Sequence, residues 1–469
     1  MRSVRGVFAA VVLILSAVAP AAAQPPAPPL PPSLPAPPDP ADLLPGVQEW
    51  IDAILPPAPV APLPPDAPPE AMPPSDVPEF GPDLAALRAA VLPSPVGDAF
   101  FDRWPAELAD AEPGQVVEVR DVGATAGALV LMPFRQALQL KFRTTDASGR
   151  PSFATATLVV PTGEWTGPGQ RPVVVNNLPI NALGRKCTIG YSMAHGLSGD
   201  LSVTDYVPPT LQVGLLRGYA VLLPDHEGPW MSYAEPVVAG RAILDAIRAV
   251  RALLPEEFGA SPYGMTGYSG GAIATNGAVK QMGDYAPELA EVVVGATLGG
   301  VPADYAILAR SMNANLASGV FMGAVLGIAR ERVEILGRMN HLAQWVSTSP
   351  LKDSCASTFG LPGVLMLPID VGANFPDPLH SDFAAEIYRE TRMADRRSPV
   401  PLYLYNGEQE WWIPAEGARE LFREQCALGV AVVYRSVPGE HVIAGGLGYP
   451  EAMVWLDDRL RGLPAPNEC

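Results

Sequence analysis

Residues 263–271 read YGMTGYSGG, a short β-type run that enters a Gly-x-Ser-x-Gly turn centred on Ser269. A helix-like stretch rich in alanine and glycine, 270–282, follows the turn directly. Gly267 and Gly271 stand two residues before and two residues after the serine, where any side chain would strike the adjoining strand or helix. The context predicts a nucleophilic serine on a strained turn at the end of a strand. A glycine-rich turn of a binding protein is the alternative.

The pattern around this turn predicts a mostly parallel sheet with helices on both faces. After Asp83, short apolar or β-branched runs alternate with longer helical patterns, and several runs are apolar throughout, as in strands buried on both faces. Helical periodicity is clearest at 240–254 and 270–282. The predicted strands are Gln136–Thr144, Ala154–Val160, Pro172–Asn176, Tyr219–Pro224, Tyr263–Thr266, Val292–Leu298, Pro401–Asn406 and Val430–Ser436.

A helical insertion is expected between the sixth and seventh predicted strands. From about residue 299 to 377 the sequence has helix-like stretches at 303–316, 320–333 and 341–346, and it has no clear strand. About 75 residues are enough for a small helical subdomain that covers the serine as a cap.

The N-terminal region predicts export followed by a linker. Two arginines, an apolar run at 7–18 and three alanines are typical of a secretory signal peptide over 1–23, with an uncleaved anchor as the alternative. Residues 24–83 are rich in proline, which predicts an extended, disordered linker without core contacts. An apolar patch within it, Val47–Leu55, is long enough for a helical turn. We expect 84–469 to form one catalytic domain.

Composition and charge exclude nucleic acid as a partner. The chain has 49 Asp and Glu against 31 Lys and Arg, a formal net charge of −18, and its basic residues are scattered.

No His-Glu-x-x-His stretch or close Cys/His pair is seen, so we expect neither a metal nor a cofactor. In an exported chain the four cysteines favour disulfides, although their spacing leaves three pairings open. They are Cys187, Cys355, Cys426 and Cys469.

The base for the serine is expected to be His441. A serine hydroxyl needs a histidine whose second nitrogen is held by a carboxylate. In chains with this turn the order is serine, acid, histidine, which sets aside His195 and His226. His341 falls in the helical insertion and His380 precedes any candidate acid strand. His441 follows the last predicted strand, on a loop at the carboxyl end of the sheet where the serine also emerges.

The acid should follow the strand 401–406, and the loop there contains Glu408 and Glu410 but no aspartate. A carboxylate only orients the imidazole and supports its positive charge, so glutamate can replace aspartate if the loop has room. Glu410 is the preferred acid and Glu408 remains the alternative.

Several stretches resemble the secretory lipase family of bacteria and fungi, over about 98–469. The stretches that carry the resemblance are 98–102, 145–150, 183–187, 218–221, 224–229, 244–248, 267–271, 438–441 and 464–469. The resemblance implies an α/β-hydrolase fold, with a sheet flanked by helices and an inserted helical cap.

The family pattern also implies roles for particular residues. Its Gly-x-x-Asp-x-x-Val-Pro motif maps onto Gly407, Glu410 and Pro414, so Glu410 occupies the aspartate position, a departure expected to weaken the triad. The first oxyanion donor lies six residues before a cysteine, at Asn181, and the second is the amide of Gly270. The disulfides that the resemblance implies are Cys187–Cys355 and Cys426–Cys469.

These observations predict a secreted or envelope-associated serine hydrolase that cleaves carboxylic esters of lipids, a triacylglycerol lipase or carboxylesterase, through an acyl-enzyme on Ser269. The expected partners are a lipid or small acyl ester and, transiently, a lipid interface at the cap. The sequence specifies no oligomeric state. Two alternatives remain: an acyltransferase of envelope lipids, and a catalytically impaired hydrolase fold used as an envelope binding module.

Overall fold

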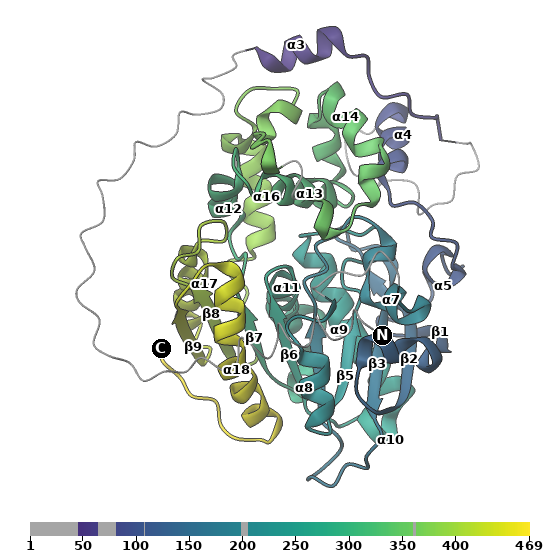
Figure 1. Ribbon diagram of the computed structural model, residues 1–469, viewed down its shortest axis with the longest axis vertical. Helices are drawn as coiled ribbons and strands as arrows, with labels where there is room; N and C mark the ends of the chain where they lie inside the picture. The colour runs from purple at the N-terminus through teal and green to yellow at the C-terminus, as the bar shows by residue number, and fades with distance from the viewer. Residues whose placement is uncertain (1–45, 64–80, 107, 198–204, 360–362) are drawn as a thin grey trace, which may run out of the picture. The chain divides into compact units, whose positions relative to one another are not determined.

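The computed structural model describes residues 46–63, 81–106, 108–197, 205–359 and 363–469 (Figure 1). The expected signal peptide and much of the expected linker lie outside these ranges.

The α-helices of the described residues are α3 (Val47–Ile54), α4 (Pro82–Val91), α5 (Ala99–Asp102), α6 (Gly123–Val130), α7 (Ile189–His195), α8 (Thr210–Leu216), α9 (Pro236–Leu253), α10 (Pro255–Phe258), α11 (Gly270–Tyr285), α12 (Tyr305–Met312), α13 (Ser318–Ala329), α14 (His341–Thr348), α16 (Asp382–Arg392), α17 (Ala415–Ala427) and α18 (His441–Leu460).

One mixed sheet organises the described residues, with nine strands in the order β1-β2-β3-β5-β4-β6-β7-β8-β9. The pairs from β1 through β3 to β5 are antiparallel, and those from β5 through β4 to β9 are parallel. The strands are β1 (Val116–Asp121), β2 (Phe134–Thr145), β3 (Pro151–Pro161), β4 (Val173–Asn177), β5 (Ala220–Pro224), β6 (Tyr263–Tyr268), β7 (Val293–Gly299), β8 (Leu402–Gly407) and β9 (Val432–Val437).

Each of the eight predicted strands is present, and β1 is an additional strand. Residues of β1 alternate between half-buried and exposed, and Val117 and Val119 face solvent at the sheet edge. An edge strand with this pattern lacks the buried apolar run on which the sequence prediction relied.

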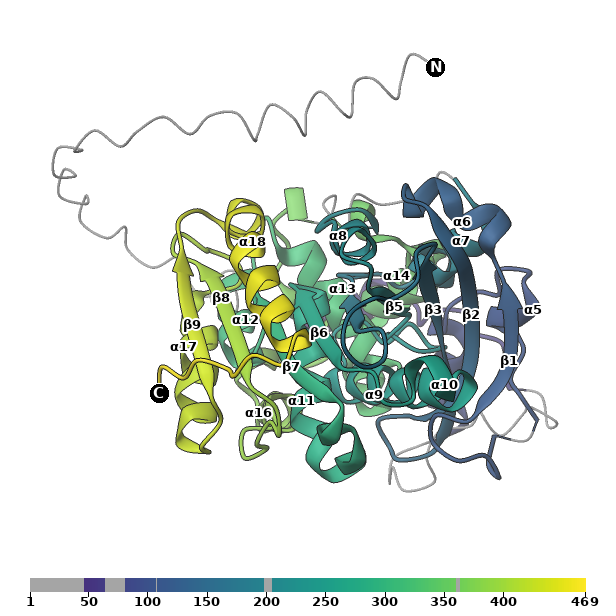
Figure 2. The same ribbon diagram turned by 90° about the horizontal axis from the view of Figure 1, so that it is seen from below.

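Helices cover both faces of the sheet, as the apolar strands require. Figure 2 shows α9, α11 and α17 on one face, and α6, α7, α8 and α18 on the other. The largest buried cluster joins the strands to α9 and α11 and includes Met265, Leu298 and Ile247. The predicted α/β class with helices on two faces is thereby confirmed.

The segment between β7 and β8 is helical and longer than predicted. It contains α12, α13 and α14, close to the expected stretches, and continues through α16 beyond the expected boundary at residue 377. These helices gather at the end of the sheet from which β7 leads out (Figure 1). Two disulfides brace this arrangement: Cys187–Cys355 joins the loop after β4 to the insertion, and Cys426–Cys469 joins α17 to the C-terminus.

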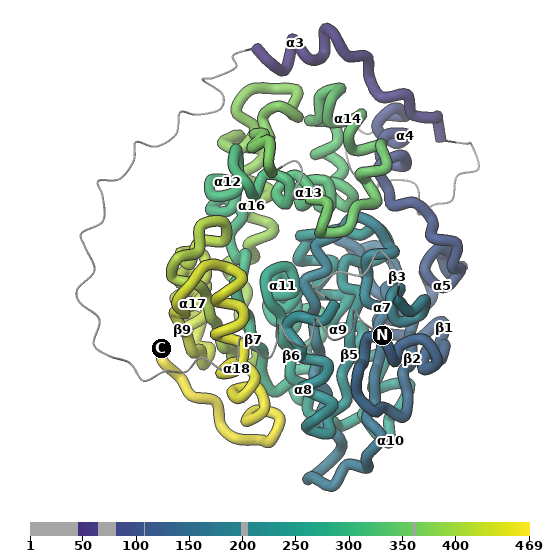
Figure 3. The backbone as a smooth tube through the Cα atoms, viewed as in Figure 1, coloured from purple at the N-terminus to yellow at the C-terminus, as the bar shows by residue number. Residues whose placement is uncertain are grey.

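Residues 46–63 differ from the predicted contact-free linker. Helix α3 packs on the insertion, where Ile51 is 6% exposed. Asp52 Oδ1 accepts a hydrogen bond of 2.8 Å from the His341 amide at the start of α14, and Trp345 Nε1 donates to Pro56 O at 2.8 Å. Figure 3 follows the chain from α3 to α4 and α5. The linker prediction is therefore wrong here, because an amphipathic helix can bury its apolar face despite neighbouring prolines.

No helix of the described residues is apolar over a length that would cross a membrane.

The docking of α3 predicts a difference between two isoleucines of that helix. Ile51→Asp places a charge in the contact with the insertion and should release α3, whereas Ile54 is 59% exposed and Ile54→Asp should be nearly silent. Limited proteolysis of the folded protein should cleave the 55–63 segment at least about tenfold faster in Ile51→Asp, because local opening exposes the backbone. Equal cleavage rates in the two variants would mean that α3 is not held on the insertion.

Candidate active site

Ser269 lies on a compressed turn between β6 and α11. Its backbone has φ 54° and ψ −120°, a conformation that non-glycine residues rarely adopt. A Cβ atom at Gly267 would lie 2.1 Å from the carbonyl oxygen of Gly271, and one at Gly271 would lie 1.9 Å from that of Asn177. Both distances are far below van der Waals contact, so the turn closes only with glycine at the two positions.

His441 is the first residue of α18, immediately after the β9 loop, and is 5% exposed. Its Nδ1 lies 2.8 Å from Oε2 of Glu410. The ring of Trp412 packs edge-on against the imidazole at 4.6 Å between centroids, and the ring of Tyr268 lies at 5.0 Å. The hydroxyl group of Tyr268 donates to the carbonyl oxygen of His441. The imidazole is therefore held by a carboxylate and by two aromatic rings.

The structure brings His441 next to the serine turn. The amide of Ser269 donates to Gly299 O on the neighbouring strand β7 at 2.9 Å. A Cβ atom at the next residue, Gly300, would lie 2.9 Å from Cε1 of His441. The serine turn and the imidazole thus both lie against the carboxyl end of β7, at Gly299 and Gly300.

Glu410, and not Glu408, contacts the imidazole. The Glu410 side chain is fully buried, and its Oε1 accepts a hydrogen bond of 3.3 Å from the Ile413 amide while Oε2 faces His441. Glu408 is exposed and accepts from Ser436 Oγ at 3.0 Å. Because Glu410 is held from both sides, the loop accommodates the additional methylene of glutamate.

Asn181 and Gly270 come together at the N-terminus of α11. Asn181 has φ 47°, in the left-handed region. Its side chain lies directly over Gly270, since a Cβ atom there would be 1.8 Å from Asn181 Oδ1. No described group donates a hydrogen bond to this buried oxygen. The first amides of a helix have no partner within the helix, so Gly270 N–H is a donor suited to an anion, and the Asn181 side chain lies beside it.

The other histidines lie in different surroundings. His226 is buried, and burial lowers its pKa to about 4, so it is neutral at physiological pH. His195 pairs with Asp98 on the exposed side of α7. His341 lies against Leu55 and His380 against Asp377. In the part of the chain that the structure describes, no group of three or more potential ligands is placed to hold a metal ion.

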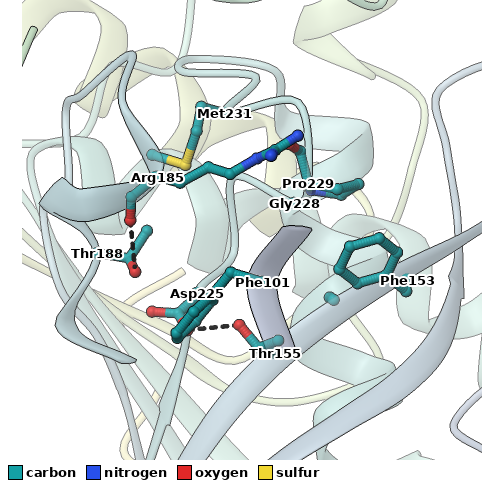
Figure 4. A pocket seen from close by; sticks show the side chains of 10 residues that line it. Phe101, Phe153, Thr155, Arg185, Thr188, Asp225, Gly228, Pro229 and Met231 are labelled. Atoms are coloured by element: carbon teal, nitrogen blue, oxygen red, sulfur yellow. Dashed lines mark hydrogen bonds between the residues drawn. The ribbon is translucent and has the colours of Figure 1, made fainter. Parts of the chain in front are cut away.

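The turn after β5 contains two further buried acids, Asp225 and Glu227. Burial raises the pKa of Asp225 to about 6, against the opposing effect of hydrogen bonds from Thr155 and Gly190. A small pocket adjoins Asp225 and is also lined by Arg185 and Met231 (Figure 4). Neither Ser269 nor His441 lines it, so this pocket is separate from the serine site.

Two aromatic residues of the site were not assigned to it from the sequence. Trp412 packs against His441, and its carbonyl oxygen accepts a hydrogen bond from Ser311 of α12. Tyr268 directly precedes the serine, but its contact with His441 spans 173 residues and no local signal predicts it. Trp411 stacks on Trp412 and is 47% exposed.

Known proteins resemble this chain in sequence and in fold. A protein of Mycobacterium tuberculosis named "probable inactive lipase" is 29% identical over 81% of this chain and 85% of its own length. The trichothecene C-3 esterase of Fusarium sporotrichioides is 29% identical over 80% of this chain and 86% of its length. The closed-state crystal structure of Candida antarctica lipase A superimposes with a TM-score of 0.70 at 24% identity, covering 81% of this chain and 90% of that chain.

The structural likeness shows that the fold is that of an α/β-hydrolase. The family description "Secretory lipase" matches residues 203–468, which include the serine turn, the insertion and the loops of Glu410 and His441. This match spans more than half of the chain, and the chain therefore belongs to the secretory lipase family.

Proposed function

We propose that this protein is a serine hydrolase that cleaves carboxylic esters of lipids. The observation that carries the proposal is the 2.8 Å contact between His441 and Glu410 beside the strained Ser269 turn. A histidine held by a buried carboxylate next to a serine at a strand end is the arrangement that activates a hydroxyl group as a nucleophile.

In the proposed mechanism, Ser269 Oγ attacks the ester carbonyl carbon while His441 Nε2 takes its proton. Glu410 holds Nδ1–H and stabilises the imidazolium. The carbonyl oxygen becomes an oxyanion, and the Gly270 amide and Asn181 stabilise it with hydrogen bonds. The intermediate collapses to an acyl-serine as His441 protonates the departing alcohol. Water then attacks the acyl group by the same steps in reverse, releasing the acid and restoring the serine.

The substrate class is inferred from apolar side chains at the site. Val442 and Ile443 follow the histidine and are 74% and 53% exposed, and Trp411 lies on the acid loop. Exposed apolar groups beside a site that cleaves esters suit an acyl chain or a lipid surface. Membership of the secretory lipase family supports a lipid ester and a location outside the cell. Transient contact of the insertion with a lipid interface belongs to the same proposal.

A second candidate is a catalytically impaired member of the fold that binds envelope lipids. Two observations favour it: glutamate occupies the position of the usual aspartate, and a relative carries the name "probable inactive lipase". The fit of Glu410 between Ile413 and His441 favours the enzyme instead.

Replacing Ser269 by alanine separates the two candidates. In the enzyme, hydrolysis of p-nitrophenyl butyrate should fall by at least about a thousandfold, with the far-ultraviolet circular dichroism unchanged. The unaltered protein should also react stoichiometrically with a fluorophosphonate probe. A folded chain that the probe does not label would support the binding module, and near-normal turnover by Ser269→Ala would refute the nucleophile.

The acid is tested by matched changes at the two glutamates. Glu410→Gln favours the wrong imidazole tautomer, so kcat should fall by up to about ten-thousandfold, whereas Glu408→Gln should be nearly silent because Glu408 contacts only Ser436. Glu410→Asp should also reduce kcat, because the shorter carboxylate no longer reaches Nδ1. Turnover of one soluble ester by all three variants decides the matter. A severe loss at Glu408 with a mild loss at Glu410 would reverse the assignment.

A further inference from the structure

The loop that carries Asn181 is fastened to the turn after β5 by buried side chains. His226 Nε2 lies 2.8 Å from the carbonyl oxygen of Leu178, the first residue after β4 and the start of this loop. The carboxyl group of Glu227 accepts a hydrogen bond of 3.4 Å from the amide of Ala182, the residue after Asn181. This acid thus holds an amide of the loop that reaches over Gly270.

Glu227 is buried beside this loop. It is 2% exposed, and burial raises its pKa well above the usual value, against the opposing effects of the Ala182 amide and the Arg330 guanidinium. Arg330 donates to Leu183 O at 2.8 Å and to Met231 O at 3.0 Å, and so joins the same two segments.

The conformation of Asn181 requires support of this kind. A non-glycine residue in the left-handed region costs roughly 1 kcal/mol and persists where its surroundings hold it. The hydrogen bond from the Ala182 amide to Glu227 holds the backbone at the residue next to Asn181, whose side chain lies over Gly270.

We infer that Glu227 is a positioning residue of the oxyanion site: it holds the amide of Ala182 and thereby the adjoining Asn181, whose side chain lies over Gly270. The inference rests on the proposed ester hydrolysis and adds to it a residue that touches no substrate. It acts on kcat, because the oxyanion exists only after the serine has attacked.

Two substitutions of equal length test the inference. Glu227→Gln keeps a carbonyl oxygen as acceptor and should retain at least about a third of the kcat on p-nitrophenyl butyrate. Glu227→Met removes the acceptor and should lower kcat by about 10- to 100-fold, with KM within about twofold, since one oxyanion donor is then misplaced. A kcat per folded molecule that is unchanged in Glu227→Met, or equally reduced in both variants, overturns the inference.

A double-mutant cycle with Asn181→Ala tests whether the effect passes through Asn181. In that background Glu227→Met should reduce kcat by no more than about threefold, because the group that it positions is absent. Losses that multiply independently overturn the inference. If Glu227→Met does not fold, Glu227→Asp takes its place: its carboxyl group falls short of the Ala182 amide and should lower kcat in the same way, and an unchanged kcat refutes the role.

Glu331 provides the matched control, because it is a buried acid in the same region that contacts Ser232 and Ala147 instead of the Asn181 loop. Glu331→Gln should leave kcat per folded molecule unchanged, and a loss equal to that of Glu227→Met would mean that any buried acid in the region matters equally.

The Ser269→Ala variant distinguishes failure of the positioning role from failure of the proposed function. If it is inactive while the Glu227 variants are normal, only the positioning role fails; if it is active, the proposed function fails.

Discussion

The site depends on how closely the backbone packs around Ser269. Gly271 lies so near the carbonyl oxygen of Asn177 that no side chain fits between them, which presses the end of β4 against the first turn of α11. The same closeness places the loop after β4, with Asn181, over the free amides of that helix. Gly300, which follows β7, has no side chain either and so leaves room for the ring of His441. The ends of β4, β6 and β7 therefore converge because Gly271 and Gly300 carry no side chain.

Much of this architecture is encoded locally and was predictable. Strands buried on both faces are apolar throughout, so the central sheet from β2 to β9 follows from the sequence pattern. Elements with weaker local signals were missed: β1 is an edge strand that faces solvent, and α16 is a polar amphipathic helix beyond the apolar part of the insertion. For α3 the flanking prolines indicated a linker, whereas its contacts with α14 decided the outcome.

The residues of the site likewise divide into those with a local sequence signal and those without one. Chain order and the position of each loop singled out Ser269, Glu410 and His441, because parallel strands deliver their carboxyl ends to one edge of the sheet. Contacts between distant segments have no such local signal. Trp412 against His441 and Glu227 beneath the Asn181 loop depend on how the loops fold onto one another. The Pro-Asp-His-Glu-Gly turn marks the place of Glu227 in the sequence, but the contact of Glu227 with the Ala182 amide is visible only in the structure.

The docking of α3 also bears on the order in which the protein assembles. Asp52 and His341 are 289 residues apart, so α3 leaves the ribosome, and crosses any membrane, long before its binding site exists. It can join the insertion only after α14 has been synthesised and folded, which makes it one of the last elements to take its place. Until then its apolar face is open to solvent and to chaperones. A translation product that stops before about residue 341 would keep that face exposed permanently, which marks it for quality control.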